Sequence, residues 1–579
     1  MRAVALLAAS LFSAGAAFAQ APRLSTARTM AEAGLVDIRA LVPDIAQDMK
    51  YAGSDNFVGA PIDGYDAPRC LLRVEAAAAL ARVEAALRED GYRLRLFDCY
   101  RPARAVAHFV RWVADPADLR TRAAHYPELD KSQLLGEYIA PVSGHSRAAT
   151  VDLTLLQCEG EGEDEDNRDA SRCTPLDMGT PFDWFGTRAN TDSPLATPAQ
   201  RDHRQRLLAA MAREGFANYP MEWWHFTLQP ERTANVAQDT IHDVPITAGD
   251  RNPAGAIDAL MQRYQGEVPG ASLLVLRDGE PVVRRGFGLS DLEQGTEAGP
   301  ATNYRLASVS KQFTAAAILL LAQDGALSVD DPVRDWLPSL PASADPITLR
   351  HLLPHTSGLV DYEDLMGDDW QGQIRDAGVL ALLEREPGLY FPPGSAYRYS
   401  NGGYALQALV VEKASGLAYP EFLERRIFEP LGMHDTLAYV AGGPEVPHRA
   451  WGYSIDWAGG WERTDQSSTS AVLGDGGIYS SIDDLARWDA ALYDDRLLSD
   501  ASRALAFAPH VEVTGEPHRA AYGFGWRITG DTLWHSGETI GFRNVIVRWP
   551  EQRLTVVLLS NRNDPEPYAT ALKIGALFR

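Results

Sequence analysis

Lysine is scarce in this 579-residue chain, since only five of the 54 basic residues are lysine and the other 49 are arginine. Acidic residues number 78, so the formal net charge is −24, which opposes binding to nucleic acid or to anionic membrane surfaces. Part of the negative charge forms the run 159–166, which we interpret as a solvated loop. Because arginine is the usual cation here, a lysine inside a motif indicates a need for lysine chemistry.

Long apolar runs are absent after the first 20 residues. Arg2, the apolar run 3–17 and Ala17-Phe18-Ala19 before Gln20 are typical of a cleavable export signal. No later stretch approaches the ~20 apolar residues of a membrane helix, and no cysteine follows the cleavage site to accept a lipid. We therefore expect a periplasmic or secreted protein that is not inserted in a membrane. An uncleaved N-terminal anchor is the alternative.

Cysteine is absent from the second half of the chain, because Cys70, Cys99, Cys158 and Cys173 all lie in the first. An oxidising compartment allows disulfides, and four cysteines allow three connectivities. We favour Cys70 with Cys99 and Cys158 with Cys173, since the second bridge would staple the acidic loop. A thiolate zinc site is the weaker alternative because there is no Cys-x-x-Cys pair.

The length of the chain predicts two domains, because 579 residues exceed what one core usually holds. Residues 229–252 have no helical or strand periodicity and are rich in polar residues and proline. We expect a signal peptide (1–19), a first domain (20–228), a linker (229–252) and a second domain (253–579).

The hydrophobic patterns predict a mixed α+β or α/β fold class. Strands at both ends of the second domain, with helices between them, suggest one mixed sheet closed by its two termini. The expected elements are a helix over 74–87, a strand over 92–96, a hairpin of 271–276 and 281–289 around Asp278-Gly279, a buried helix over 313–323, strands over 544–549 and 554–559, and a helix over 568–578.

The first domain carries histidines and carboxylates in a pattern that suits a metal. His145 is followed by Asp152, and Glu222-Trp223-Trp224-His225 comes later. Two imidazoles and one carboxylate suit Zn²⁺ with a fourth position open to water. Hydrolysis also needs a base, and Glu222 lies three residues before a ligand. The alternative is that both histidines are ordinary buried residues.

An ordered series of motifs makes residues 35–228 resemble the D-alanyl-D-alanine dipeptidases, the metallopeptidases known from vancomycin resistance. The series is Tyr51-Ala52, Asn56-Phe57-Val58-Gly59, Asp98-Cys99-Tyr100-Arg101-Pro102, Ser143-Gly144-His145-Ser146-Arg147, Val151-Asp152-Leu153-Thr154-Leu155, Met178-Gly179-Thr180-Pro181-Phe182-Asp183 and Glu222-Trp223-Trp224-His225. The resemblance implies a small α+β zinc peptidase of the hedgehog and D,D-peptidase type.

The same resemblance implies a role for each site residue. The zinc ligands would be His145, Asp152 and His225, with Glu222 as general base. Arg101 would stabilise the developing oxyanion, Asp183 would pair with the free ammonium of the substrate, and Ser143 would contact the substrate. One departure is Ala148, which stands where the family has glycine and whose methyl group would shift the ligand loop.

The second domain has its own motif at Ser308 and Lys311, which are three residues apart at the start of an apolar helix. A group that must release its proton to activate a serine can be lysine but not arginine. The companion motifs are Tyr399-Ser400-Asn401, His535-Ser536-Gly537, His355-Thr356-Ser357-Gly358-Leu359 and Gly474-Asp475-Gly476-Gly477.

Together these motifs make residues 254–579 resemble the serine beta-lactamase and penicillin-recognising superfamily, in the branch of class C lactamases, D,D-peptidases and related esterases. The resemblance implies an antiparallel sheet with a helical subdomain and Ser308 as the acylated nucleophile. Lys311 and Tyr399 would transfer protons, and Asn401 would hold the substrate amide. The substrate would also meet His535, Gly537 and Glu538, with the backbone N–H groups of Ser308 and Glu538 forming the oxyanion hole.

His535 departs from the family pattern because it stands where many lactamases have the lysine of Lys-Thr-Gly. A histidine is partly charged near neutral pH, so it would recognise a substrate carboxylate weakly and in a pH-dependent way. This favours a peptidase or an esterase over an efficient lactamase.

We therefore expect a bifunctional hydrolase of small D-amino-acid peptides, including peptidoglycan fragments. The first domain would cleave D-Ala-D-Ala to two D-Ala, and the second would be a serine D,D-carboxypeptidase or aminopeptidase-like enzyme. One alternative makes the second domain an esterase or a beta-lactamase. Another makes the chain a peptide-binding and penicillin-binding sensor, against which Glu222 argues, since a binding module needs no base beside an open metal.

Overall fold

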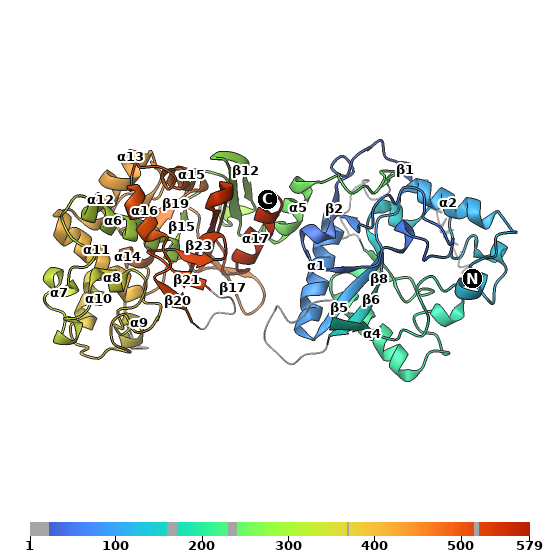
Figure 1. The fold of residues 1–579 in the computed structure, drawn as a ribbon, viewed down its shortest axis with the longest axis horizontal. Coiled ribbons are helices and arrows are strands. Elements are labelled where there is room, and N and C mark those ends of the chain that lie inside the picture. Colours follow the sequence, from blue (N-terminus) through green and yellow to red (C-terminus); the bar gives the residue numbers. More distant parts are fainter. Residues whose placement is uncertain (1–21, 159–171, 230–239, 368–369, 515–519) are drawn as a thin grey trace, which may run out of the picture. The chain divides into compact units, whose positions relative to one another are not determined.

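The computed structural model describes residues 22–158, 172–229, 240–367, 370–514 and 520–579. It contains two compact units, Met1–Ala259 and Leu260–Arg579 (Figure 1). The predicted two-domain mixed architecture is confirmed, whereas the expected signal peptide and the acidic run at 159–166 lie outside the described residues. No helix in the described part of the chain is both long and apolar enough to cross a membrane.

The first unit is built on a six-stranded sheet in the order β3-β5-β6-β9-β8, with β7 paired to β6. Only the β3/β5 pair is parallel among these pairs. The strand β6 is buried along most of its length and lies between β5 and β9, so the side chains at that junction are held in fixed register. The strands are β3 (Ala46–Gln47), β5 (Tyr92–Asp98), β6 (Thr150–Cys158), β7 (Cys173–Pro175), β8 (Phe216–Asn218) and β9 (His225–Leu228).

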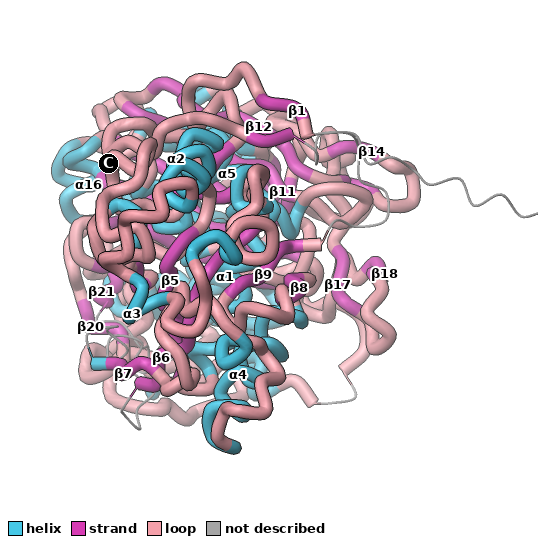
Figure 2. Tube along the Cα trace, turned by 90° about the vertical axis from the view of Figure 1, so that its right-hand side faces the viewer, coloured by secondary structure: helices cyan, strands magenta, loops and turns pink. Residues whose placement is uncertain are grey.

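Two long helices accompany this sheet. The predicted Ala-rich helix is α1 (Val74–Glu89), which packs against β5 (Figure 2). Its small buried side chains at 76–79 allow a close approach. The helix α4 (Pro198–Arg213) begins at a capping box formed by Thr197 and Gln200. The unit also contains β1 (Arg23–Leu24), β2 (Leu35–Asp37), β4 (Leu71–Arg73), α2 (Ala103–Val113), α3 (Arg122–His125), β10 (Thr240–Ile241) and α5 (Pro253–Leu260), which extends one residue past the boundary.

Both disulfides have the predicted pairing. Cys70 is bonded to Cys99, directly after β5, and Cys158 is bonded to Cys173, which joins β6 to β7. No free cysteine is left.

The expected linker is shorter than its composition suggested. Residues 240–252 belong to the first unit, because β10 pairs in parallel with β1, and Val244 and Ile246 are buried. The hydroxyl of Tyr100 accepts from the Val244 N–H at 2.8 Å and donates to its carbonyl at 3.1 Å. Isolated apolar residues among polar ones leave no periodic pattern, which is why the sequence did not predict this packing.

The second unit is organised around an eight-stranded sheet in the order β12-β11-β25-β24-β23-β22-β21-β20. Every pair is antiparallel, as the resemblance implied and unlike the mixed sheet suggested by element order. Strands from both ends of the domain meet where β11 pairs with β25. The predicted hairpin turn is present, with Asp278 and Gly279 both at positive φ. The strands are β11 (Ala271–Arg277), β12 (Glu280–Phe287), β20 (Val511–Val513), β21 (Ala520–Tyr522), β22 (Arg527–Thr529), β23 (Thr532–Thr539), β24 (Phe542–Trp549) and β25 (Leu554–Ser560).

Helices cover both faces of this sheet (Figure 1). The final helix α17 packs on one face, where Tyr568 stacks on Trp534 of β23. The buried helix α6 and its neighbours form the helical subdomain on the other face. The helices are α6 (Lys311–Gln323), α7 (Val333–Trp336), α8 (Leu349–Leu352), α9 (Tyr362–Leu365), α10 (Asp376–Leu383), α11 (Asn401–Ser415), α12 (Tyr419–Leu423), α13 (Glu429–Leu431), α14 (Leu473–Gly476), α15 (Ile482–Ala491), α16 (Asp500–Ala506) and α17 (Tyr568–Ala576).

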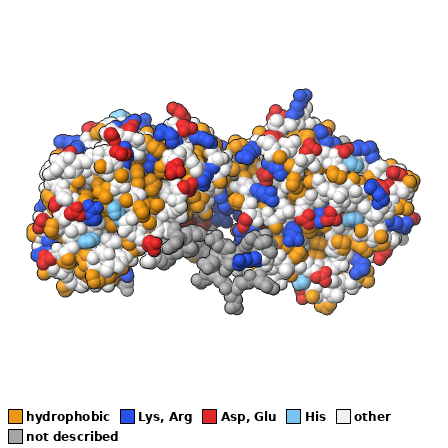
Figure 3. Space-filling view, viewed as in Figure 1, with side chains coloured by type: hydrophobic (Ala, Val, Ile, Leu, Met, Phe, Trp, Pro, Cys, Tyr) orange, Lys and Arg blue, Asp and Glu red, His pale blue; other side chains and the backbone are white. Residues whose placement is uncertain are grey.

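Shorter strands complete the second unit. They are β13 (Leu289–Asp291), β14 (Thr296–Glu297), β15 (Tyr304–Arg305), β16 (Leu437–Ala438), β17 (Tyr453–Ile455), β18 (Trp461–Arg463) and β19 (Ile478–Ser480). On the face shown in Figure 3, basic and acidic side chains are interspersed on both units. The acidic excess is therefore not concentrated in one patch on that face.

Candidate active sites

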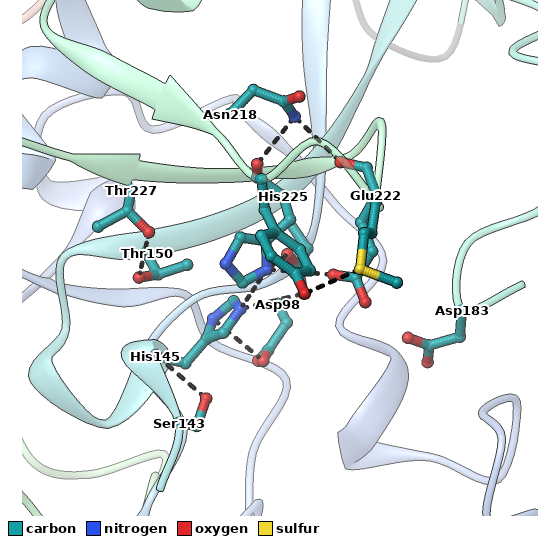
Figure 4. Close-up of polar contacts among 12 residues, drawn as sticks. Asp98, Ser143, His145, Thr150, Asp183, Asn218, Glu222, His225 and Thr227 are labelled. Atoms are coloured by element: carbon teal, nitrogen blue, oxygen red, sulfur yellow. Dashed lines mark hydrogen bonds and ion pairs between the residues drawn. The ribbon is translucent and has the colours of Figure 1, made fainter. Parts of the chain in front are cut away.

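The three predicted metal ligands converge in the first unit, and Figure 4 shows the side chains of His145 and His225 close together. His145 lies on a 3-10 turn (Gly144–Arg147), whereas Asp152 on β6 and His225 on β9 are direct partners across the antiparallel pair. His145 Nε2 is 3.3 Å from Asp152 Oδ2, His225 Nδ1 is 3.1 Å from Asp152 Oδ1, and the two imidazoles approach to 3.4 Å. Sheet register and one turn thus bring together residues 80 positions apart.

The donor atoms of these three side chains are of the kinds that bind a zinc ion. His145 Nδ1 lies 2.6 Å from the Cys99 carbonyl, so this nitrogen carries the proton and Nε2 presents a lone pair to the cluster. Asp152 Oδ1 is buried and makes no hydrogen bond of good geometry within the described residues, although His225 Nδ1 lies 3.1 Å away. Burial opposes ionisation of Asp152, but the two facing imidazoles hold its pKa far below the usual range. The cluster therefore combines an anionic oxygen with two imidazole nitrogens, as zinc sites do.

Glu222 stands beside this cluster on the turn before β9. Its Oε2 is 3.4 Å from His225 Nδ1, and Asn218 Nδ2 fixes the turn by donating to the carbonyls of Glu222 and His225, both at 3.0 Å. Burial raises the pKa of Glu222 to about 7. A carboxylate with a pKa near neutrality can accept a proton and then release it, which is what a general base must do.

Arg101 is held next to the cluster by a residue that sequence reasoning gave no role. The carboxylate of Asp98 accepts from Arg101 Nε at 3.0 Å and from its NH2 group at 2.8 Å, and it also accepts from the hydroxyl of Tyr65. Asp98 is fully buried and pairs in register with Asp152 across β5 and β6. The signal for it in the sequence is its place in the motif Asp98-Cys99-Tyr100-Arg101-Pro102.

The predicted substrate residues lie around the same cavity. Its volume is about 250 Å³, and its lining includes Arg101, Ser143, Asp183, Glu222 and His225. Both oxygens of Asp183 lie 3.1 Å from the hydroxyl of Tyr51. Burial and the charge of Asp152 raise the pKa of Asp183 well above its usual value. An ammonium group entering the cavity would favour the ionised form of this carboxyl.

The backbone conformation at Ala148 explains why glycine suits this position in the family pattern. Its φ is +56°, in the left-handed region, and it ends the turn that carries His145. The Ala148 N–H donates to the His145 carbonyl at 2.9 Å, and the residue is fully buried. The methyl group is accommodated in this geometry, so the turn keeps His145 in the cluster.

The second site centres on Lys311, the first residue of α6. Its Nζ donates to Ser308 Oγ at 2.9 Å, to Asn401 Oδ1 at 2.8 Å and to the Asp475 carbonyl at 2.9 Å. Ser308 lies on the preceding 3-10 turn, where Ala307 has a left-handed φ of +49°. Strained backbone of this kind is concentrated at functional sites. The predicted nucleophile and its lysine are therefore in direct contact, and the side chain of Lys311 is buried.

Two further predicted residues lie at this site, Tyr399 beside Lys311 and Gly537 beside the turn that carries Ser308. The ammonium of Lys311 is 4.9 Å from the ring centroid of Tyr399. Gly537 on β23 packs so tightly that an added Cβ would lie 2.0 Å from the Leu306 carbonyl. Only glycine permits this approach, which brings residues 537 and 538 next to the turn that carries Ser308.

The expectation for His535 is corrected by the structure. His535 is fully buried: its Nε2 lies 2.8 Å from the hydroxyl of Tyr522, and its Nδ1 lies 2.5 Å from the Ser536 carbonyl. Burial, with Arg527 and Lys311 nearby, lowers its pKa well below the usual value. A neutral imidazole with both nitrogens engaged cannot serve as a pH-dependent cation for a substrate carboxylate. The motif alone did not predict this, because the burial of a residue depends on the whole fold.

Two residues at this site were missed by sequence reasoning. The carboxylate of Glu363, on α9, accepts from Asn401 Nδ2 at 3.0 Å and so fixes the orientation of that amide. The guanidinium of Arg527, on β22, lies 5.9 Å from the ring centroid of Tyr399 and 6.0 Å from that of Tyr522. Neither residue belongs to a recognisable motif, so only the fold places them here.

Comparison with known proteins gives the family of each unit. A family described as D-ala-D-ala dipeptidase matches residues 31–246, and one described as beta-lactamase matches residues 254–577. A D-alanyl-D-alanine dipeptidase of Streptomyces coelicolor is 40% identical over 214 residues, which are 36% of this chain and 95% of that protein.

Relatives of the second unit are also clear. Penicillin-binding protein 4* of Bacillus subtilis is 34% identical over 319 residues, which are 52% of this chain and 70% of that protein. The solved structure of an octameric penicillin-binding protein homologue from Pyrococcus abyssi aligns with a TM-score of 0.51 at 28% identity, over 56% of this chain and 76% of its own. The chain therefore belongs to two hydrolase families, with a D-Ala-D-Ala dipeptidase domain followed by a serine hydrolase domain of the beta-lactamase and penicillin-binding type.

Proposed function

We propose that the first domain is a zinc-dependent dipeptidase that hydrolyses D-Ala-D-Ala to two D-Ala. The observation that carries this proposal is the position of Glu222, a buried carboxylate 3.4 Å from the ligand His225 in a cavity of about 250 Å³. When bound by His145, Asp152 and His225, zinc would supply the Lewis acid for peptide hydrolysis. A cavity of this size suits a dipeptide better than a longer chain.

The side chains around the cavity would orient the dipeptide. Glu222 would take a proton from the attacking water and pass it to the leaving amine. The guanidinium of Arg101, fixed by Asp98, would hydrogen-bond the oxyanion that develops at the scissile carbonyl. Asp183 would select substrates with a free ammonium end, so N-acylated peptides should be rejected. Ser143, in the lining of the same cavity, would contact the substrate.

For the second domain we propose a serine hydrolase that acts on D-configured peptides, including fragments of peptidoglycan. The contact between Lys311 Nζ and Ser308 Oγ supports an acylated serine. Asn401 would hold the substrate amide, and the backbone N–H groups of Ser308 and Glu538 would receive the oxyanion. The neutral, buried His535 argues against an efficient lactamase and favours a peptidase or an esterase.

We further propose that the protein is exported to the periplasm or the cell exterior. The two disulfides support an oxidising compartment, and the first 19 residues have the pattern of a cleavable signal. Peptides that carry D-amino acids from the cell wall occur in that compartment, and both domains would then draw on one pool.

The first experiment measures D-Ala released from D-Ala-D-Ala by the full protein with zinc supplied. Glu222→Gln keeps the shape of the side chain but removes the base, so the rate should fall by about 10²- to 10⁴-fold. The Ser308→Ala variant should keep the full rate, and a chelator should abolish it. No release by the wild type would refute the dipeptidase proposal.

A second assay tests the serine site with p-nitrophenyl acetate and with N-acetyl-D-Ala-D-Ala peptides. Turnover that disappears in Ser308→Ala and persists in Glu222→Gln would support the proposed serine hydrolase. Ester turnover without peptide cleavage would replace the peptidase with an esterase. Stoichiometric labelling by a fluorescent penicillin without any turnover would support the penicillin-binding sensor instead.

A further inference from the structure

His355, in the turn after α8, has a backbone conformation that few side chains adopt. Its φ is +62° and it is only 1% exposed. Left-handed residues other than glycine are uncommon, and those that persist are held by their surroundings. The proposed mechanism gives this residue no direct role.

The contacts of His355 bracket Tyr399 on both sides. The carbonyl of His355 accepts from the Arg398 N–H at 3.1 Å, and its imidazole Nδ1 accepts from the Ser400 N–H at 3.1 Å. The imidazole ring also lies against the Tyr399 ring, with centroids 4.3 Å apart. One residue thus fixes the backbone before Tyr399, the backbone after it and one face of its ring.

In this left-handed conformation the carbonyl and the side chain of His355 both bond to the segment 398–400. For Nδ1 to accept, the ring must be neutral with its proton on Nε2. Burial and the nearby charge of Lys311 lower the pKa of His355 well below its usual value. The neutral state that the geometry requires is therefore the favoured one.

The other edge of the imidazole reaches the third motif. The ring centroid of His355 is 4.5 Å from that of Tyr522 in an edge-to-face arrangement. Tyr522 in turn shares a hydrogen bond with His535 Nε2. His355 therefore links the segment that carries Tyr399 to the strand that carries Gly537, and these two segments flank Ser308.

We propose that His355 is a positioning residue of the serine site, which holds Tyr399 over Lys311 for proton transfer through its two hydrogen bonds to the flanking backbone. The inference rests on the proposed roles of Ser308, Lys311 and Tyr399. A residue that only positions a proton-transfer group should affect turnover more than substrate affinity.

Asparagine and leucine have side chains of the same shape, so substituting each of them for His355 separates the effect of the hydrogen bond from that of the packing. His355→Asn places Oδ1 where Nδ1 lies, and asparagine tolerates a left-handed backbone. His355→Leu has the same branching but cannot accept from Ser400. His355→Gly fits the backbone without strain and also lacks the acceptor, which keeps the test valid if the leucine variant does not fold.

The control for backbone strain is His448→Leu. His448 is an exposed residue of the same unit with a φ of +46°, so leucine there meets a similar conformational penalty outside the serine site. This variant should keep the wild-type turnover of p-nitrophenyl acetate.

With p-nitrophenyl acetate and the full protein, His355→Leu and His355→Gly should lose about 10- to 100-fold in kcat with KM little changed, since they disturb part of the acid–base contribution. His355→Asn should stay within about threefold of the wild type, because it keeps the acceptor. Wild-type kcat in the leucine and glycine variants, or equal losses in all three, would overturn the proposal. An inactive wild type that a fluorescent penicillin does not label would instead show that the proposed serine mechanism is wrong.

Discussion

Asp152 and His225 are direct partners across the antiparallel strands β6 and β9, with Asp152 Oδ1 and His225 Nδ1 3.1 Å apart. Asp98 pairs with the other side of Asp152 across β5 and β6. Three adjacent strands therefore place Asp98, Asp152 and His225 side by side in one row. A site built on sheet register is rigid before any metal binds, which is favourable for catalysis.

This arrangement predicts that zinc stabilises the first domain alone. A metal that binds only the folded state at 100 times its Kd adds about 2.7 kcal/mol to the free energy of unfolding. Zinc added to chelator-treated protein should therefore raise the thermal midpoint of one transition and leave that of the second domain unchanged. His225→Ala should abolish the shift, whereas His203→Ala, on α4, should retain it. A shift of equal size in the His225 variant would show that the metal binds elsewhere.

A second prediction concerns Ala148, which is buried and left-handed beside the ligand turn. In Ala148→Gly, relief of the left-handed backbone is worth about 1 kcal/mol, and it is offset by the loss of a buried methyl group, about 0.8 kcal/mol. We expect its unfolding free energy to stay within about 1 kcal/mol of the wild type once the flexibility of glycine is included.

Ala148→Val should behave differently, because a β-branched side chain fits neither the left-handed backbone nor the closed space. We expect a loss of about 2 kcal/mol or more in unfolding free energy and weaker zinc binding, measured by denaturant titration and by competition with a chromogenic chelator. Unchanged zinc affinity in the valine variant would mean that this turn does not set the position of His145.

How far the sequence predicts this protein depends on whether a feature is local. The α1 helix, the hairpin at Asp278-Gly279 and the pairing of Cys158 with Cys173 follow from periodicity, turn chemistry and separation along the chain. The packing of Val244 and the burial of His535 do not, because each depends on partners far away in sequence. Motif reasoning named the groups for chemistry, but it gave no role to residues that hold them in place, such as Asp98 and His355.

The buried histidines predict how the stability of the second domain depends on pH. The pKa values of His355 and His535 are lowered in the folded state. Below about pH 6.5 the unfolded state then binds more protons than the native state, so the contribution of each histidine falls by about 1.4 kcal/mol per pH unit as the pH decreases. Between neutrality and pH 5, these two residues should therefore destabilise the domain.

Carboxyl groups in the same domain act in the opposite direction. Burial raises the pKa of Asp376 to about 6 and that of Asp475 to about 7, so their contributions to stability fall as the pH rises through these values. The histidine effect is isolated by comparing variants. The difference in unfolding free energy between the wild type and His535→Gln should shift against the wild type as the pH decreases from 7 to 5, while exposed His448→Gln should match the wild type. Parallel curves for all three proteins would contradict a buried, neutral His535.

The last prediction concerns Arg204, a residue of α4 that is 1% exposed and lies outside the cavity. Its guanidinium donates to the carbonyls of Met178, Arg188 and Asn190, which are spread along the segment that carries Asp183. Arg204→Lys keeps the charge, but a single ammonium cannot reproduce the planar fork that spans the three carbonyls. The segment should loosen, and Asp183 should lose its fixed position relative to the metal ligands.

Because Asp183 is proposed to bind the ammonium end of the substrate, the expected effect is on affinity. For D-Ala-D-Ala we expect KM to rise about tenfold, the loss of roughly one hydrogen bond to a charged group, with kcat changed much less. The matched control is Arg93→Lys, since Arg93 is equally buried but bonds Glu84 and Asp44. If both variants raise KM alike, general destabilisation is the cause. If only Arg204→Lys does so, α4 contributes to the substrate affinity of the site by fixing the segment 178–190, which carries Asp183.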